Sequence, residues 1–182
     1  MTDLAKYCEV RSLMRPGDVI SFLAPFSPIS WFTPRGAHKC DHVASVVTSP
    51  SLCSRRLIME ATGKHGVKPA ALSKRLRTHG GRAWWHRLDA TDEQREAIER
   101  WLWAQMDKDY DFGGVALNIG AYVSEDLARL FCSELAGGAI VRGVPAETMA
   151  PNDAVRKLRD GKALRPWDVV ALPVFLPAWR IL

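Results

Sequence analysis

Short apolar runs separated by turn-forming residues dominate the first half of the chain. Residues 19–23 follow the turn Arg15-Pro16-Gly17-Asp18, and residues 42–48 and 57–61 are rich in β-branched and other apolar side chains. Runs of this length and composition are typical of strands that are buried on one or both faces. With residues 82–88, they predict four strands.

The second half of the chain shows helical periodicity. Thr91 and Gln94 form a capping box, and the helix that they begin carries an apolar stripe and ends near Lys108. Further helices are predicted at 69–76, at 115–122 and at 124–141, where Gly143 and Pro145 end the last of them.

Two further elements complete the predicted order. Pro151 suits the first turn of a basic helix that ends at Gly161, and residues 169–172 form a final strand candidate. Strands that cluster and helices that follow them indicate an α+β fold with a small, mainly antiparallel sheet packed on helices. The pattern shows no repeat and no break in composition, so we expect a single domain over residues 1–182.

Composition and charge narrow the function classes. The chain has 182 residues, 47% hydrophobic and 25% charged, with a net charge of +5. The basic residues are scattered in short clusters and form no stripe or motif, so we expect no nucleic-acid partner. No apolar run is long enough to span a membrane, and the polar first residues lack the core of a signal peptide, so we expect a cytoplasmic protein.

Residues 24–41 contain several prolines and read as a loop with apolar side chains at Phe26, Ile29, Trp31 and Phe32. This loop is either a lid or wall beside a site or a packed surface loop. Together with the apolar tail 174–179, it suggests an acyl-chain groove or a peripheral contact with an anionic membrane. The competing interpretation is that both segments pack on the sheet.

The cysteines suggest no disulfide framework and no cofactor. Cys8, Cys40, Cys53 and Cys132 have neither framework spacing nor a CxxC pair. His38, Cys40 and His42 alternate, which on a strand would align three metal-type ligands, but no fourth ligand is evident. We therefore expect no metal and no cofactor.

Three residues supply the parts of thiol catalysis. Cys132 lies near the start of a helical pattern, where the helix dipole would favour its thiolate, or inside an unbroken helix, where it would be inert. If strands 42–48 and 57–61 form a hairpin centred on Ser51, His42 and Glu60 lie directly opposite each other. Cys132 would then be the nucleophile, His42 the base and Glu60 the residue that orients the ring, with N–H groups at the helix start binding the oxyanion.

Four motifs in order resemble the NlpC/P60 superfamily: residues 41–47, Met59-Glu60-Ala61 with Gly66-Val67, residues 110–112, and residues 131–135. His and Glu come first here and Cys last, which resembles the circularly permuted, YiiX-like branch with its papain-like fold. Gly17-Asp18 at the start of the first strand also resembles that branch.

The resemblance implies a cysteine hydrolase or acyltransferase that acts on an amide or ester bond in a peptide, a cell-wall peptide or a lipid. It implies Cys132 as nucleophile, His42 as base and Glu60 as third residue, with Tyr110 as a substrate-side or supporting residue. Asp111 and Trp31 are weaker candidates of the same kind. Asp41 stands where a small Ser is usual, and its carboxylate would raise the pKa of His42. The alternatives are a catalytically silent papain-like binding protein and a basic nucleic-acid-binding module.

Overall fold

The computed structural model describes residues 4–27, 37–48, 55–63, 65–107, 127–162 and 164–182. Six strands form one sheet in the order β4-β3-β2-β1-β5-β6, and every neighbouring pair is antiparallel. The strands are β1 (Val19–Leu23), β2 (His42–Val47), β3 (Leu57–Thr62), β4 (Gly66–Ala71), β5 (Arg82–His86) and β6 (Trp179–Arg180). The predicted α+β class with a mainly antiparallel sheet is confirmed.

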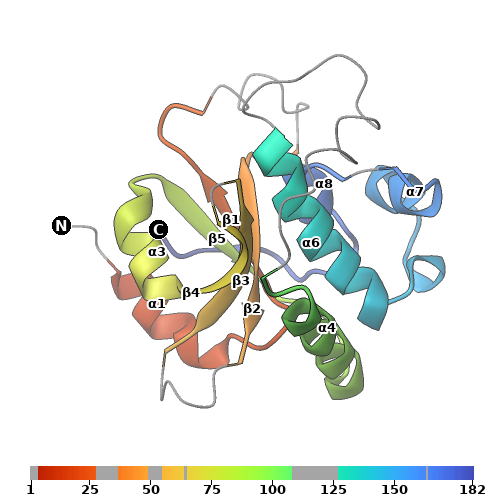
Figure 1. Ribbon diagram of the computed structural model, residues 1–182, viewed down its shortest axis with the longest axis horizontal. Helices are drawn as coiled ribbons and strands as arrows, with labels where there is room; N and C mark the ends of the chain where they lie inside the picture. Colours follow the sequence, from red (N-terminus) through yellow and green to blue (C-terminus); the bar gives the residue numbers. More distant parts are fainter. Residues whose placement is uncertain (1–3, 28–36, 49–54, 64, 108–126, 163) are drawn as a thin grey trace.

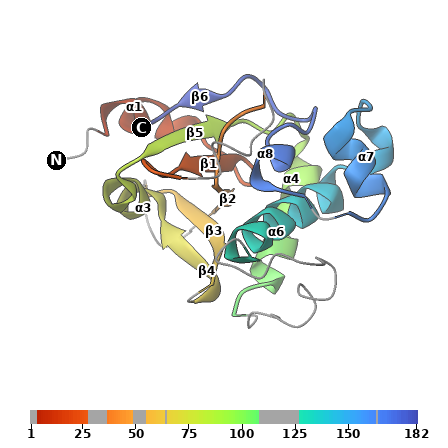
Figure 2. The same cartoon turned by 90° about the horizontal axis from the view of Figure 1, so that it is seen from above.

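Helices cover both faces of this sheet (Figures 1 and 2). One face packs on α1 (Ala5–Val10), the short 3-10 turn Arg11–Leu13 and α3 (Leu72–His79). On the other face, α6 (Leu127–Gly143) packs on β2 and β3, and α4 (Asp92–Ala104) and α8 (Pro166–Val169) pack on α6; α7 (Asp153–Arg159) packs on α8 and on the 3-10 turn Ala146–Thr148. Because both faces are covered, β1 and β2 are buried along almost their whole length instead of alternating between core and solvent.

The alternation of side chains assigns β1 and β2 residues to the two cores. Ile20, Phe22, Ala44 and Val46 join the core beneath α1 and α3. Val19, Val43 and Val47 join the core beneath α4 and α6. Successive strand residues point to opposite faces, so Ser21 shares the α6 face with Val19, whereas His42 is paired with Phe22 on the α3 face.

The capping box of α4 is confirmed. Thr91 Oγ1 accepts a hydrogen bond from the Gln94 amide at 3.3 Å, and Gln94 Oε1 accepts one from the Thr91 amide at 2.9 Å. The helix ends at Ala104, earlier than predicted. It packs closely on α6, since a Cβ at Gly143 would lie 2.4 Å from the Gln94 carbonyl oxygen.

One predicted helix begins later than expected, and one predicted strand is wrong. Residues 66–71 form β4, so the helix expected at 69–76 begins only at Leu72. Pro69 is tolerated because β4 is an edge strand, where a missing N–H need not break the ladder. Residues 169–172 were expected as a strand, but Val169 is the last residue of α8 and residues 170–172 form the turn that follows it; Pro166 begins this helix by fixing its first residue.

Smaller differences affect the C-terminal part. Pro151 precedes α7 instead of lying in its first turn, and Asn152 caps the helix by accepting a hydrogen bond from the Val155 amide at 2.9 Å. The predicted basic character of this helix is confirmed in its last turn. The two-residue strand β6 was not predicted, since it is too short to show a periodicity. The helix expected at 115–122 lies outside the described residues.

A buried ion pair ties the start of β1 to α4. The Asp18 carboxylate accepts hydrogen bonds from Arg95 Nη1 at 2.9 Å, from Trp85 Nε1 at 2.8 Å and from the Leu88 amide at 3.1 Å. The side chains of Arg95 and Asp18 are only 8% and 2% exposed. Within the described ranges, no helix combines the length and apolar composition that crossing a bilayer requires.

Candidate active site

His42 is the first residue of β2 and lies at the end of the sheet. Its ring packs against the ring of Phe22, with centroids 5.8 Å apart. Its Nε2 lies 3.1 Å from Oε2 of Glu60 in β3, within hydrogen-bonding distance. Both side chains are largely buried, with 13% and 12% of their surface exposed. The structure therefore pairs the two residues that the sequence analysis proposed as base and orienting carboxylate.

The register of the hairpin differs from the expected one. Ser45 lies opposite Met59 in the β2–β3 ladder, so the ladder places Ala44, not His42, opposite Glu60. The expectation of a directly opposed His42–Glu60 pair is wrong by two residues. A slip of two keeps both side chains on the same face, so their contact is diagonal and the long glutamate side chain spans it.

Cys132 lies in α6 and is 1% exposed. It forms a side-chain hydrogen bond with His42, and its thiolate also attracts the imidazolium. Cys132 belongs to the core beneath α6, whereas His42 is paired with Phe22 on the opposite face. The two side chains therefore meet at the end of the sheet. Figure 1 shows α6 beginning beside the end of the sheet at which β2 begins.

The surroundings of His42 favour its charged form. Burial alone would lower its pKa, but the Cys132 thiolate and the Glu60 carboxylate together raise the pKa of His42 to about 9. In return, His42 and Arg75 lower the pKa of Glu60 despite its burial. The imidazole of His42 is thus held between the side chain of Cys132 and the carboxylate of Glu60.

The helix-start interpretation of Cys132 is not supported. α6 begins at Leu127, so Cys132 lies more than one helical turn beyond the start of the helix. The effect of a helix dipole falls off within the first turn, and backbone N–H groups beyond that turn bond within the helix. The expected oxyanion donors at the start of this helix therefore do not surround Cys132, whose side chain instead contacts His42.

Arg75 of α3 is a site residue that the sequence analysis did not find. Its Nε lies 3.2 Å from the Glu60 oxygen that also contacts His42. Its guanidinium carbon lies 5.1 Å from the centroid of the Phe22 ring. The helix 72–79 was predicted in part, but the strand β4 that precedes it was not. Without β4, nothing in the sequence indicated that Arg75 would lie beside Glu60.

Asp41 has a structural role in the described geometry. The residue is 5% exposed, and its carboxylate accepts a hydrogen bond from the Ala24 amide at 3.0 Å. It therefore anchors the chain that leaves β1, and it is not among the groups that raise the pKa of His42. Three further candidates, Trp31, Tyr110 and Asp111, lie outside the described residues.

A second polar cluster lies on the α6 face of the sheet. Ser21 Oγ lies 2.8 Å from Nε2 of His86 and 3.1 Å from Nε2 of His38. Burial lowers the pKa of His86 to about 3 and also lowers that of His38. Both rings are therefore neutral near pH 7, and the hydroxyl bridges them. No alternation indicated this cluster, because Ser21 is the single polar residue of β1 and His86 is the last residue of β5.

The metal-type alternation of His38, Cys40 and His42 does not form one face. His38 and Cys40 precede β2, which begins only at His42. Cys40 is fully buried beside Cys132, and burial, followed by the charge of Cys132, raises the pKa of its thiol well above the usual value. Among the described residues, no three or more His, Cys, Asp and Glu side chains are grouped so that they could hold a metal ion.

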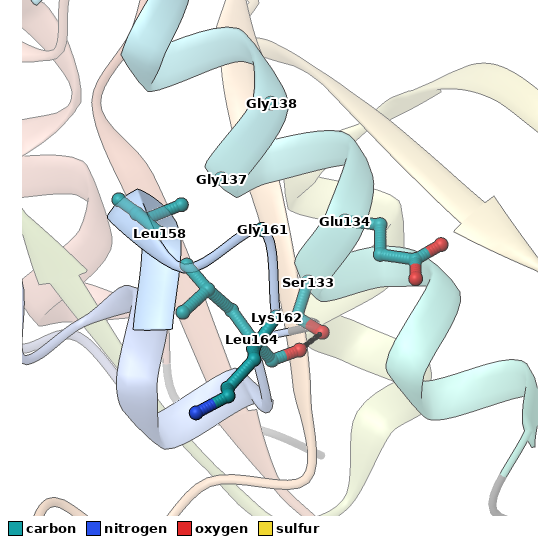
Figure 3. A pocket seen from close by; sticks show the side chains of 8 residues that line it. All are labelled: Ser133, Glu134, Gly137, Gly138, Leu158, Gly161, Lys162 and Leu164. Atoms are coloured by element: carbon teal, nitrogen blue, oxygen red, sulfur yellow. Dashed lines mark hydrogen bonds between the residues drawn. The ribbon is translucent and has the colours of Figure 1, made fainter. Parts of the chain in front are cut away.

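A cavity of about 510 Å³ opens beside α6 (Figure 3). The Ser133 hydroxyl donates to the Leu164 carbonyl at its floor. In Figure 3 the Glu134 carboxylate and the Lys162 ammonium point to opposite sides of this hydrogen bond. Ser133 follows Cys132 directly, but the cavity is lined by another face of α6, and neither Cys132 nor His42 contributes to it.

The apolar segments that were proposed to contact a lipid lie partly in the core and partly at the surface. Phe26 is 96% exposed, and Ile29, Trp31 and Phe32 lie outside the described residues. In the tail, Val174 is buried, whereas Trp179 is 54% exposed in the edge strand β6.

Comparison with known proteins finds a structural relative but no sequence match. Neither a model of a protein family nor a curated protein matches the sequence. The fold is similar to the crystal structure of "metalloprotein yiiX from Escherichia coli O157:H7", with a TM-score of 0.59 and 20% sequence identity. The similarity covers 90% of this chain and 95% of that chain. The chain therefore has the permuted papain-like fold of YiiX, as the order of its motifs predicted.

Proposed function

We propose that this protein is a cysteine hydrolase or acyltransferase that cleaves an amide or ester bond through a thioester intermediate. The observation that carries the proposal is the continuous chain of side chains from Cys132 through His42 to Glu60. The fold of YiiX is compatible with this chemistry, because papain-like folds place a thiol beside an imidazole in this way.

The first step forms the thioester. The sulfur of Cys132 attacks the carbonyl carbon of the substrate, and the carbonyl electron pair moves to oxygen. When the tetrahedral intermediate collapses, the C–N or C–O bond breaks and the His42 imidazolium gives its proton to the leaving amine or alcohol. The product of this step is an acyl group on Cys132 and a neutral His42.

The second step releases the acyl group. His42 takes a proton from water, or from an acceptor amine or alcohol, which then attacks the thioester carbonyl. The C–S bond breaks, and the thiolate and imidazolium return. Water gives hydrolysis and another nucleophile gives acyl transfer. In both steps Glu60 holds the ring of His42 and stabilises its charged form.

The protein of similar fold, YiiX, is a metalloprotein. Within the described ranges, the His, Cys, Asp and Glu side chains form no group that fits a metal ion. No step of the proposed reaction is therefore assigned to a metal.

Selective alkylation tests the proposal, and Cys40 provides a matched control. Both Cys40 and Cys132 are buried, but burial raises the pKa of Cys40 and keeps it a thiol, whereas Cys132 faces His42. Brief treatment with iodoacetamide at pH 6.5, followed by peptide mass spectrometry, should modify Cys132 at least tenfold faster than Cys40. The exposed Cys8 is replaced by Ser in all proteins tested.

A chromogenic phenyl ester then tests bond cleavage. The expected result is an acyl group on the peptide that contains Cys132, lost in Cys132→Ala and retained in Cys40→Ala. His42→Gln should reduce acylation by about 100-fold, which is the usual contribution of a general acid–base residue. Equal alkylation of Cys40 and Cys132, with no acyl adduct, would overturn the proposal and leave a catalytically silent papain-like protein.

A further inference from the structure

One carboxylate oxygen connects two cationic side chains. Oε2 of Glu60 lies 3.1 Å from Nε2 of His42 and 3.2 Å from Nε of Arg75. The two nitrogens that share this oxygen therefore lie within about 6.3 Å of each other. When His42 is charged, Glu60 stabilises two cations at once, and those cations repel each other.

Arg75 is held in place on a second side. Its guanidinium carbon lies 5.1 Å from the centroid of the Phe22 ring, whose face attracts a cation. The same ring contacts His42, with centroids 5.8 Å apart. Phe22 is fully buried, and the Arg75 side chain is 29% exposed, so its charge is only partly screened by solvent.

The other groups near His42 come from four segments. α6 contributes the Cys132 thiolate, and α3 contributes His79, whose pKa is lowered by burial and by Arg75. In β4, Lys68 is paired with Glu60 across the ladder but is exposed. Asp41 precedes His42, and its carboxylate bonds to the Ala24 amide. Of these, Arg75 is the cation that shares the oxygen bound to His42.

From this geometry we infer that Arg75 is a positioning residue of the proposed thiol site. It fixes the Glu60 carboxylate against His42, and its charge limits how firmly His42 retains its proton. The inference rests on the proposed function and identifies a fourth residue for it. Without Arg75, Glu60 would stabilise the imidazolium alone, and a more stable imidazolium is a weaker acid toward the leaving group.

The test is a pH titration of the His42 ring by NMR, in the full chain, with the resonance assigned from His42→Gln. Arg75→Gln keeps an N–H donor for Glu60 but removes the charge. Its His42 midpoint should rise by about 0.5–1 pH unit, a discounted value for a partly exposed charge whose nitrogen lies within about 6.3 Å. Arg75→Lys keeps the charge and should return the midpoint most of the way to the wild-type value.

Lys74→Gln is the matched control, because it removes the same charge from the next, exposed position of α3. Its midpoint should equal that of the wild type. Circular dichroism melting verifies that each variant folds. A merely structural Arg75 would lower the melting temperature of Arg75→Gln without raising the midpoint of His42, and that result would overturn the inference.

Two readouts keep the inference separate from the proposed function. Alkylation of Cys132 in the wild type reports on the thiol site, and the His42 midpoint reports on Arg75. If Cys132 of the wild type is alkylated selectively but the His42 midpoint is unchanged in Arg75→Gln, the inference is overturned and the proposed function is not. A raised midpoint without selective alkylation of Cys132 overturns the proposed function, while Arg75 remains the residue that sets the charge of His42.

Discussion

His42 and Glu60 meet diagonally across the β2–β3 ladder, two residues away from direct opposition. The side chain of Glu60 is long enough to span that offset. A shorter aspartate at position 60 would face Ala44, which lies directly opposite it in the ladder. The contact survives the offset because a shift of two residues preserves the face of the strand.

Replacement of Glu60 by Gln should reduce the pH dependence of stability above pH 6.5. Because the pKa of His42 is raised to about 9 in the folded protein, the stabilisation from its proton is complete below the ordinary value near 6.5. It is lost as pH rises through 9. Without the carboxylate the raised pKa falls, so Glu60→Gln should lose about 1–3 kcal/mol less than the wild type between pH 6 and pH 9.5.

Urea unfolding at the two pH values measures this difference. Glu96→Gln in α4 is the control, because this replacement removes the same charge from an exposed position. If Glu60→Gln and the wild type weaken equally toward pH 9.5, Glu60 does not hold the charged form of His42.

His86 should make the protein sensitive to acid. Burial, then the charge of His38, lowers the pKa of His86 to about 3, so the folded protein keeps this ring neutral while the unfolded chain takes up a proton below pH 6.5. Stability from this group is present above pH 6.5 and is lost progressively as pH falls toward 3. At pH 4.5 the loss should be about 2–3 kcal/mol.

His86→Gln should be less stable than the wild type at pH 7, because Ser21 loses a hydrogen-bond partner, but should weaken less between pH 7 and pH 4.5. Urea unfolding at both pH values gives the comparison. The exposed His65, changed to Gln, should leave the acid dependence unaltered. An identical acid dependence in His86→Gln would show that the ring is charged in the folded protein.

Asp18→Asn should strongly destabilise the fold. The change leaves the buried guanidinium of Arg95 without its carboxylate, and the loss of one partner from such a pair costs about 3–5 kcal/mol. Trp85 also loses its carboxylate acceptor, so tryptophan emission should change in the folded state. Chemical unfolding followed by fluorescence measures both effects.

The exposed pair of Arg15 and Asp92 provides the comparison. Their side chains are 52% and 74% exposed, so Asp92→Asn should cost no more than about 1 kcal/mol. Equal losses for Asp18→Asn and Asp92→Asn would contradict the buried network at the start of β1.

Gly143→Ala should separate α6 from α4. The added Cβ would lie 2.4 Å from the Gln94 carbonyl oxygen, and backbone cannot move aside as a side chain can. We expect a loss of about 2 kcal/mol or more and slower alkylation of Cys132, because α6 carries the thiol. Thermal melting and iodoacetamide labelling measure the two effects.

Gly137→Ala introduces the same group into the same helix. Its Cβ would meet only the end of the Leu164 side chain, at 3.0 Å, and Ala favours a helix over Gly. This variant should therefore remain within about 1 kcal/mol of the wild type. A larger loss of stability for Gly137→Ala than for Gly143→Ala would contradict the close contact between Gly143 and α4.

The sequence predicted the central strands because their apolar and β-branched runs are dense. It predicted α4 because Thr91 and Gln94 satisfy each other at its start. β4 was missed because Pro69 reads as the start of the helix predicted at 69–76, whereas an edge strand tolerates this proline. Residues 169–172 look like a strand by composition, yet Pro166 and the capping contacts of Asp168 form a short helix that ends at Val169, and a turn follows it.

For the site, the sequence identified His42, Glu60 and Cys132, which the structure brings together. It did not find Arg75, because a contact between a helix and a strand 15 residues earlier depends on how the helix crosses the sheet. It also misplaced the register by two, since the length of a hairpin loop cannot be counted from composition. No local pattern tells whether a cysteine in a long helical segment begins the helix or lies within it.

Ser21 and Phe22 are neighbours in β1 and point to opposite faces of the sheet. Ser21 bonds to His38 and His86 on one face, and Phe22 packs against His42 and His79 on the other. Four of the five histidines are thus arranged around one dipeptide. Displacement of β1 by a single residue would place Phe22 or Ile20 where two imidazoles need a hydroxyl, and correspondingly Leu23 or Ser21 where His42 needs a ring. The register of β1 therefore determines the surroundings of both histidine groups, and a change of that register alters both groups together.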